Sequence, residues 1–279
     1  MWVPKHILCV VGNWSSFEDV RTAVMLASDS AFAIDEEYSL LTAEPRMVDS
    51  FESCRDRARP SWTQEDRDAV ARHQAVIYVM SPPVMAGESI AYSAAALRVI
   101  AALLRTGGTA AKSESAGIAH GRTEWLRLAD AAAATTAQAE PAALPNLLRD
   151  AFVRLPLLDA DDEAYYTCGM HLLGQRDFEM PAELDAHESI RWFNRASDFV
   201  LRTAATRSPL DRLLYLDDDV RIVADGGPCL RYPEDSFFYN PYGYWALLEI
   251  DDSDDATNDE RDADTHAHRA PSNNDPDMN

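Results

Sequence analysis

A cysteine and a histidine lie three residues apart in the segment Cys168-Gly169-Met170-His171. A cysteine thiolate next to a histidine base is a common nucleophile, so Cys168 and His171 are one candidate pair for covalent catalysis. Residues so close together in one loop rarely reach the geometry that such a pair needs, and no oxyanion-hole motif surrounds them. The interpretation that we favour is a buried cysteine followed by a histidine in a turn.

A glutamate and a histidine enclose a run of small residues between positions 114 and 120. A carboxylate and an imidazole can act as general acid and base, so Glu114 and His120 are a second catalytic candidate. His120 also stands before a predicted helix, whose N-terminus could hold an anion. The interpretation that we favour is a loop from a strand to a helix, in which His120 caps the helix or packs against it.

The remaining polar clusters do not predict a metal site. Asp217, Asp218 and Asp219 are consecutive and lack the alternation with glycine that a calcium loop has. His266 and His268 supply too few fixed ligands for a transition metal. The four cysteines are widely spaced, which is typical of reduced thiols and not of a zinc site or a disulfide framework. We therefore predict neither a metal nor another cofactor.

The charge of the chain restricts its partners. It carries 47 acidic and 25 basic residues, a formal charge of −22. Nucleic-acid binding needs clustered Lys and Arg, so we do not expect it. Residues 251–279 contain ten acidic residues, two arginines and no large aliphatic side chain, a formal −8 that leaves −14 for residues 1–250. Such a tail is predicted to be disordered. A basic protein is the partner that this charge favours.

The apolar stretches do not predict a membrane segment. The run 7–11 is too short for a signal-peptide core, and no small-residue cleavage site follows it. The stretch 90–104 is interrupted by Arg98 and falls short of the roughly 20 residues of a spanning helix. It is expected to be a buried helix, and the protein to be cytoplasmic with no membrane partner.

Alternating strands and helices must position the candidates in the first half of the chain. Continuous apolar, β-prone runs predict strands at 6–11, 32–42, 75–80 and 109–115. Helical spacing of apolar residues predicts helices at 17–26, 47–57, 63–72, 88–105 and 121–130. Thr63 and Asp66 can form a capping pair at the third of these helices. This order predicts an α/β half, residues 1–133, with a mixed sheet covered by helices.

The second half is expected to combine strands and one long helix. Residues 134–149 are Ala-rich and contain Pro141 and Pro145, so they are predicted to be a joint. Beyond it, residues 150–250 form the C-terminal α+β half, with residues 251–279 as the disordered tail. The C-terminal half is expected to begin with a hairpin, made of strands 151–158 and 164–168 across an acidic turn at 159–162. A helix at 185–203 follows it. The half is expected to end with strands at 220–223, 230–232 and 244–250 and a turn at Gly226-Gly227. The fold class is α+β.

The segment from Thr167 to Glu179 resembles a bacterial family of unknown function whose members carry Thr-x-Gly-Met-x-x-x-Gly-x-x-Asp-x-Glu. The stretch 107–120 with Trp125 after it, and the stretch 240–245, are similar to that family too. The resemblance implies a cytoplasmic α+β protein, and some members look like neighbours of toxin or type VI secretion genes. It supplies no catalytic residues, and the matched glycines, Asn-Pro and Trp can all be structural.

Three classes of function remain open. The leading hypothesis is an immunity or regulatory protein whose acidic surface caps a basic partner, such as a toxin domain. Its expected binding residues are Asp177, Glu179, Tyr239 and Tyr242. Further aromatic residues could serve as anchors or simply pack in the sheet: Tyr165, Phe237, Phe238 and Tyr244. The alternative is a hydrolase that uses His120 with Glu114 or Cys168 with His171, and these groups would then have to converge on one pocket. The third, a scaffold or nucleic-acid mimic, would need a dense acidic stripe.

Overall fold

The computed structural model describes residues 3–59, 62–137, 141–157, 164–183, 185–206, 213–217 and 220–250. Its helices and two sheets confirm the α+β fold class. Several features expected from the sequence lie outside the described residues: the acidic tail 251–279, the acidic turn 159–162, Asp218 and Asp219, and His266 and His268.

The first sheet contains five strands in the order β2-β3-β1-β4-β5. Their bounds are β1 (Ile7–Gly12), β2 (Ala33–Leu40), β3 (Ala75–Met80), β4 (Gly108–Ser113) and β5 (Ile118–His120). Every pair of neighbouring strands is antiparallel, so the sheet expected to be mixed in this half is antiparallel, and one isolated parallel bridge joins Arg55 to Ala119 of β5. The strand β1 lies in the middle with six buried residues, which explains its uninterrupted apolar sequence.

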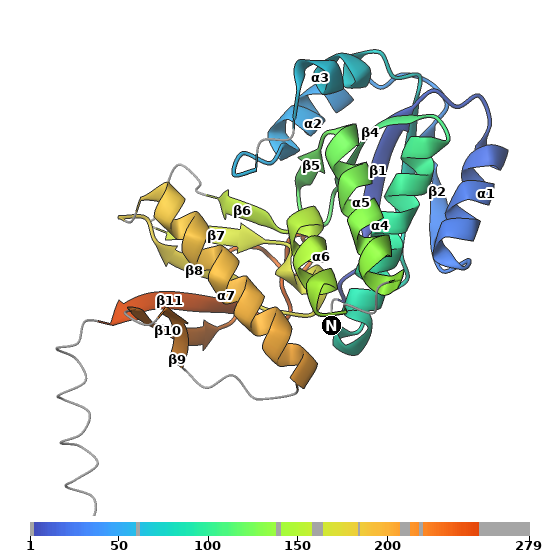
Figure 1. Cartoon of the computed structure of the whole chain (residues 1–279). Helices are drawn as coiled ribbons and strands as arrows, with labels where there is room; N and C mark the ends of the chain where they lie inside the picture. Colours follow the sequence, from blue (N-terminus) through green and yellow to red (C-terminus); the bar gives the residue numbers. More distant parts are fainter. Residues whose placement is uncertain are drawn as a thin grey trace, which may run out of the picture.

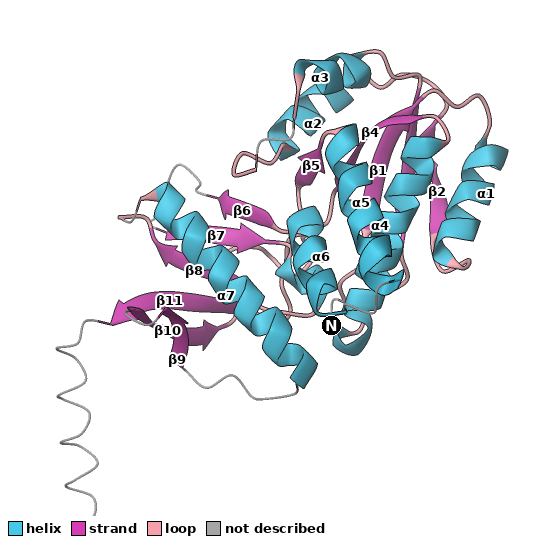
Figure 2. Cartoon of the chain, viewed as in Figure 1, coloured by secondary structure: helices cyan, strands magenta, loops and turns pink. Residues whose placement is uncertain are grey.

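The second sheet has six strands in the order β6-β7-β8-β11-β10-β9. Their bounds are β6 (Arg154–Leu157), β7 (Ala164–Cys168), β8 (Asp177–Pro181), β9 (Leu213–Asp217), β10 (Val220–Gly227) and β11 (Tyr244–Ile250). The pairing of β8 with β11 is parallel and the others are antiparallel, so this sheet is mixed (Figure 2).

Helices join the two sheets (Figure 1). The first sheet is covered on one face by α1 (Phe17–Ser28), α4 (Ser89–Arg105) and α5 (Arg122–Ala137), and on the other by α2 (Met47–Cys54) and α3 (Gln64–Ala71). The helix α6 (Leu144–Phe152) packs against α4 and α5. The helix α7 (Ala186–Thr206) packs against α6 and on the second sheet. Short 3-10 helices occur at Ala86–Glu88, Pro141–Ala143 and Met170–Leu173.

One hydrophobic core runs through both halves of the chain. It contains Val10 of the first sheet, Trp125 and Phe152 of the helical layer, and Phe178 of the second sheet. A smaller core lies under α2 and α3 and includes Cys9, Val11, Phe51, Val70 and Ala119. Successive residues of β1 therefore enter different cores, because neighbouring side chains of a strand point to opposite faces.

The stretch Ala86–Arg105 has the length and apolar composition of a membrane-crossing helix. Of its most apolar window, 56% is buried inside the protein. This stretch contains α4, which fits the expectation of a buried helix at 90–104. A core helix passes the same test of length and composition, so the stretch is weak evidence for a membrane.

Helical structure fills much of the expected joint at 134–149. The helix α5 continues to Ala137, and α6 begins at Leu144 with Pro145 in its first turn. Proline is tolerated there because the N–H that it lacks has no partner within the helix. The strand expected from residue 151 therefore begins only at Arg154.

Gly226 and Gly227 do not form the expected turn. Both lie in β10 and pair with Trp245 and Tyr244 of β11. A side chain at Gly226 would collide with Arg176, whose guanidinium lies 4.5 Å from the centre of the Trp245 ring. The glycine is thus needed for this stacked pair. The expected strand at 230–232 is a loop, whereas the strands β5 and β8 were not anticipated.

Candidate functional site

The segment that carries the family resemblance builds a buried polar cluster around Asp177, which we call the Asp177 hub. The Asp177 carboxylate is fully buried. It accepts hydrogen bonds from Thr167 Oγ1 (2.9 Å), the Met170 N–H (3.1 Å) and Asn240 Nδ2 (2.7 Å). Thr167 Oγ1 in turn accepts from the Phe178 N–H at 2.9 Å. The hub thus ties β7, β8 and the loop before β11 together.

Gly169 of the same segment has a structural role. Its φ of 122° belongs to a region that side chains disfavour, and a Cβ there would lie 2.1 Å from the Phe152 carbonyl oxygen. The glycine allows the chain to turn from β7 into the 3-10 helix that carries His171. Thr167, Gly169 and Asp177 of this segment therefore fix the backbone around the hub.

Cys168 and His171 are both buried beside the hub. Cys168 is 1% exposed and His171 is fully buried, with its Nδ1 3.9 Å from Asp177 Oδ2. Burial, together with the negative charge of Asp177, raises the pKa of the Cys168 thiol well above its ordinary value. A thiol that stays protonated and is closed to solvent is poorly suited to attack a substrate.

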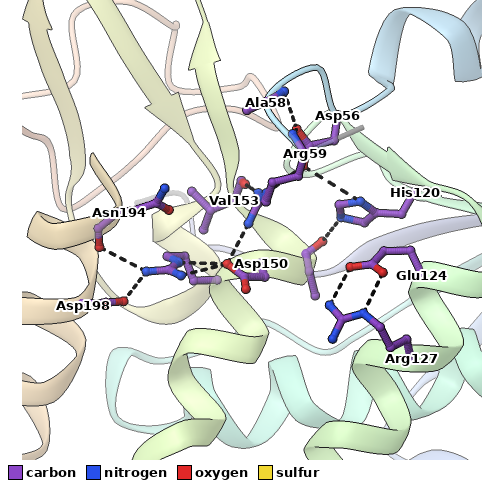
Figure 3. A network of polar contacts seen from close by, with 12 residues as sticks. Asp56, Ala58, Arg59, His120, Glu124, Arg127, Asp150, Val153, Asn194 and Asp198 are labelled. Carbon is purple, nitrogen blue, oxygen red and sulfur yellow. Dashed lines mark hydrogen bonds and ion pairs between the residues drawn. The ribbon is translucent and has the colours of Figure 1, made fainter. Parts of the chain in front are cut away.

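His120 is buried in a second polar network (Figure 3). Its Nε2 lies 3.3 Å from the Ala151 carbonyl oxygen and its Nδ1 lies 4.0 Å from Asp56 Oδ2. Burial lowers the pKa of His120 to about 4, although the Asp56 carboxylate opposes the shift. At neutral pH the ring is therefore uncharged. Asp56 itself is held by the Ala58 N–H (2.9 Å) and by Arg59 Nε (2.8 Å).

Two arginines extend this network from the first half of the chain to the second. Arg59 also donates to Asp150 Oδ1 (2.8 Å) and to the Val153 carbonyl oxygen (2.6 Å). Arg149 binds the carboxylates of Asp150 and Asp198. The network connects the loop after α2 with α6 and α7, as Figure 3 shows. We call it the Arg59 clamp. Its two arginines each bridge carboxylates of the network, Arg59 between Asp56 and Asp150 and Arg149 between Asp150 and Asp198, which is the arrangement of a structural junction.

Glu114 and His120 are not brought together. Ala111 pairs with His120 and Lys112 pairs with Ala119, so Lys112 and His120 project from opposite faces of the sheet. Glu114 lies with Lys112: its Oε1 accepts from Lys112 Nζ at 2.9 Å and from the Tyr78 hydroxyl at 3.2 Å. The predicted acid–base pair is thus divided between the two faces.

A further pair, Ser50 and Lys112, comes together in the structure, although no motif connects the two residues. Lys112 Nζ donates to Ser50 Oγ at 2.5 Å, and a Ser–Lys pair can form a nucleophile and its base. Burial acts to lower the pKa of Lys112, but Cys9 and Glu114 outweigh it and the pKa lies above its ordinary value. Burial also raises the pKa of Cys9 to about 12. The ion pair of Lys112 Nζ with Glu114 Oε1 at 2.9 Å favours the charged lysine, which cannot take the proton of Ser50.

Glu114 lines an open cavity of 480 Å³ on the part of the sheet that α2 and α3 leave uncovered. We call it the Tyr78 groove. Its walls come from the first sheet and from the loop before β11: Lys5, Ile7, Asp35, Tyr38, Tyr78, Met80, Glu114 and Phe237. Tyr38 is 64% exposed and Phe237 is 50% exposed. The groove combines exposed aromatic walls with two carboxylates.

The expected binding residues lie outside this groove. Asp177 is buried in its hub, so its carboxylate contacts only its own chain. Glu179 is partly exposed, 3.8 Å from Arg231. Tyr239 and Tyr242 are partly buried, and Tyr239 packs against the cluster formed by Tyr166, Cys229 and Tyr244. Phe237 lines the groove and was among the aromatic candidates, whereas Asp35 and Tyr38 carried no recognisable signal.

Among the described residues, no group of three or more His, Cys, Asp and Glu side chains could hold a metal ion. All four cysteines are free thiols, and three of them are buried. Comparison with models of protein families, with curated proteins and with solved structures found no match.

Proposed function

We propose that this chain is a cytoplasmic immunity or regulatory protein that caps a basic protein partner at the Tyr78 groove. A toxin domain is the example suggested by the family resemblance. The observation that carries the proposal is the position of Tyr38 and Phe237. These two aromatic side chains are at least half exposed, come from opposite halves of the chain and face one cavity. Exposed aromatic residues at the rim of a pocket are typical anchors of protein interfaces.

The carboxylates of the groove favour a basic partner. Asp35 Oδ1 accepts from the N–H groups of Glu37 and Tyr38, and Glu114 Oε1 accepts from Lys112 and Tyr78. Glu114 is thus already paired with Lys112, whereas Asp35 has no ion pair among the residues described. Asp35 can therefore bind a cationic group, and the charge of −22 would speed the approach of a basic protein.

The hydrolase alternative has less support. His120, Cys168 and His171 are all buried, and the three are divided between the Arg59 clamp and the Asp177 hub. Glu114 reaches a cavity, but its neighbour Lys112 is held in the charged form. A hydrolase would need a nucleophile and a base that meet at one accessible place.

Affinity capture with the full chain as bait tests the proposal. Wild type and a Leu230→Ala control, altered at a residue that is 87% exposed and does not line the groove, should retain the same basic protein from the native host. The double variant Tyr38→Ala/Phe237→Ala should lose it, and retention should weaken as salt rises. A partner that binds the double variant equally well, or none that is basic, would contradict the proposal.

A further inference from the structure

The strand β2 forms an edge of the first sheet. On one side it pairs with β3, and on its other side the described chain contains no strand. The regular part of the ladder is short, with Ala33 opposite Met80, Ile34 opposite Val79 and Asp35 opposite Tyr78. Apart from the Asp35 carbonyl, which accepts from Ser39, the backbone groups of residues 33–35 that point away from β3 are therefore open to a further strand.

A bulge follows this open segment. The register shifts between Asp35 and Leu40, and the Asp35 side chain accepts from the Glu37 and Tyr38 N–H groups. The Ser39 hydroxyl donates to the Asp35 carbonyl oxygen at 2.6 Å. Bulges limit uncontrolled pairing at sheet edges, so addition of a strand is restricted to the residues before it.

Two cavities flank this edge on opposite faces of the sheet. One, of 420 Å³, lies between α1 and β2 and is lined by Val24, Met25, Phe32 and Ile34 among others; we call it the α1 cavity. Its lining residues Val24 and Phe32 belong to the main core. The Tyr78 groove lies on the other face, where Tyr78 packs against the small core under α2 and α3.

The cavities differ in charge. At the α1 cavity, Glu36 is already paired with Arg21 at 2.6 Å, which leaves mainly apolar walls. At the Tyr78 groove, Glu114 is likewise paired with Lys112, and Lys5 also lines the wall. Asp35 is the carboxylate there that has no ion pair in the described part of the chain, and its Oδ2 has no hydrogen bond. An apolar side chain fits the first cavity, and a lysine or arginine fits the second.

Resting on the proposed function, we propose that the basic partner adds an extended segment to the outer edge of β2 at Ala33–Asp35. Its backbone pairs with β2, and its successive side chains point to opposite faces. Apolar side chains enter the α1 cavity and Lys or Arg side chains enter the Tyr78 groove. The bound segment of the partner should therefore alternate apolar residues with Lys or Arg along its sequence.

Charge disfavours two other occupants of this edge. A second copy of the chain would place Asp35, Glu36 and Glu37 opposite the same residues. The chain's own tail, residues 251–279, carries a formal −8 and would be repelled by the same carboxylates. A basic segment of another protein has neither disadvantage.

Selection of random linear peptides of about twelve residues, displayed against the full chain, tests this binding mode. Enriched peptides should alternate basic and apolar residues. N-methylation of a selected peptide at every second residue should weaken binding about tenfold, because it removes backbone donors to β2, and methylation at the other residues should change little. Enriched peptides without alternation, or equal effects at both sets of positions, would overturn strand addition.

Single substitutions test which type of partner side chain each cavity accepts. Asp35→Asn keeps the oxygen that accepts the Glu37 and Tyr38 N–H groups, so the bulge should persist while the charge is lost. It should reduce the preference for Lys and Arg about threefold to tenfold and leave the apolar preference unchanged. Met25→Lys should reduce the preference for apolar residues and leave the preference for Lys and Arg unchanged. Met25 is 48% exposed and lines only the α1 cavity.

The outcomes separate the two proposals. A partner captured through Tyr38 and Phe237, together with peptides that lack alternation, would leave protein binding in place and overturn strand addition. If no peptide is enriched, strand addition is likewise overturned. Loss of capture alone, with alternating peptides still selected, would contradict the capping function and retain the edge as a peptide-binding site.

Discussion

The Asp177 hub and the Tyr78 groove both contain carboxylates, but they use them differently. Asp177 is fully buried, and its two oxygens accept hydrogen bonds from Thr167, Met170 and Asn240. Asp35 and Glu114 lie at an open cavity; Glu114 is paired with Lys112, and Asp35 has no ion pair among the described residues. A buried charge must be satisfied within the protein, whereas a partly exposed one can bind another molecule. We therefore assign a structural role to the hub and propose that binding takes place at the groove.

The largest expected effect is at the hub. Asp177→Ala leaves the buried donors of Thr167, Met170 and Asn240 without their acceptor, so the free energy of unfolding should fall by about 3 to 5 kcal/mol. Urea denaturation followed by circular dichroism measures this. Glu179→Ala, two residues along the same strand and partly exposed, is the matched control and should change stability by less than about 1 kcal/mol. Equal losses of unfolding free energy in Asp177→Ala and Glu179→Ala would contradict the stabilising role of the Asp177 hub.

The Arg59 clamp should give the next largest effect. Arg59→Met removes the arginine that pairs with Asp56 and Asp150, together with a donor to the Val153 carbonyl, and should lower the free energy of unfolding by about 2 to 4 kcal/mol. Arg127→Met is the control because the Arg127–Glu124 pair is more exposed, and it should cost less than about 1 kcal/mol. Thermal and urea unfolding compare the two. An equal loss of unfolding free energy in Arg59→Met and Arg127→Met would contradict a stabilising role of the Arg59 clamp.

A smaller effect should appear as a pH dependence of stability. The pKa of His120 is about 4 in the folded chain and about 6.5 in an unfolded one, so the unfolded state binds more protons between these values. Stability should therefore decrease as the pH falls through this window, by about 2 kcal/mol between roughly pH 7 and pH 5 from this group. His120→Gln should lose that part of the slope. An unchanged slope would show that His120 titrates normally in the folded protein.

The elements that the sequence predicts best are those with strong local signals. The run 75–80 is the strand β3, and Thr63 with Asp66 forms the predicted capping box of α3. The strands β5 and β8 were missed because three to five residues next to glycine-rich turns carry little periodicity of their own. β8 depends on pairing with β7 and β11, and those contacts are tertiary. Short strands are fixed by their neighbours more than by their own sequence.

The groove was harder to predict than the fold. Glu114 was identified, but as the partner of His120, because spacing along the chain does not show that the two lie on opposite faces. Tyr38 is exposed by a bulge that depends on contacts from Asp35 and Ser39. Phe237 reaches the groove from the loop before β11. Nothing in the sequence distinguishes it from the other aromatic residues that were candidate anchors.

Hydrogen–deuterium exchange of the full chain, with and without its captured basic partner, tests the central claim most directly. We predict that amides of residues 33–40 become protected on binding, while those of residues 167–181 keep the exchange rates of the free protein. Protection confined to 167–181, with none at 33–40, would contradict the assignment of binding to the groove and its neighbouring sheet edge.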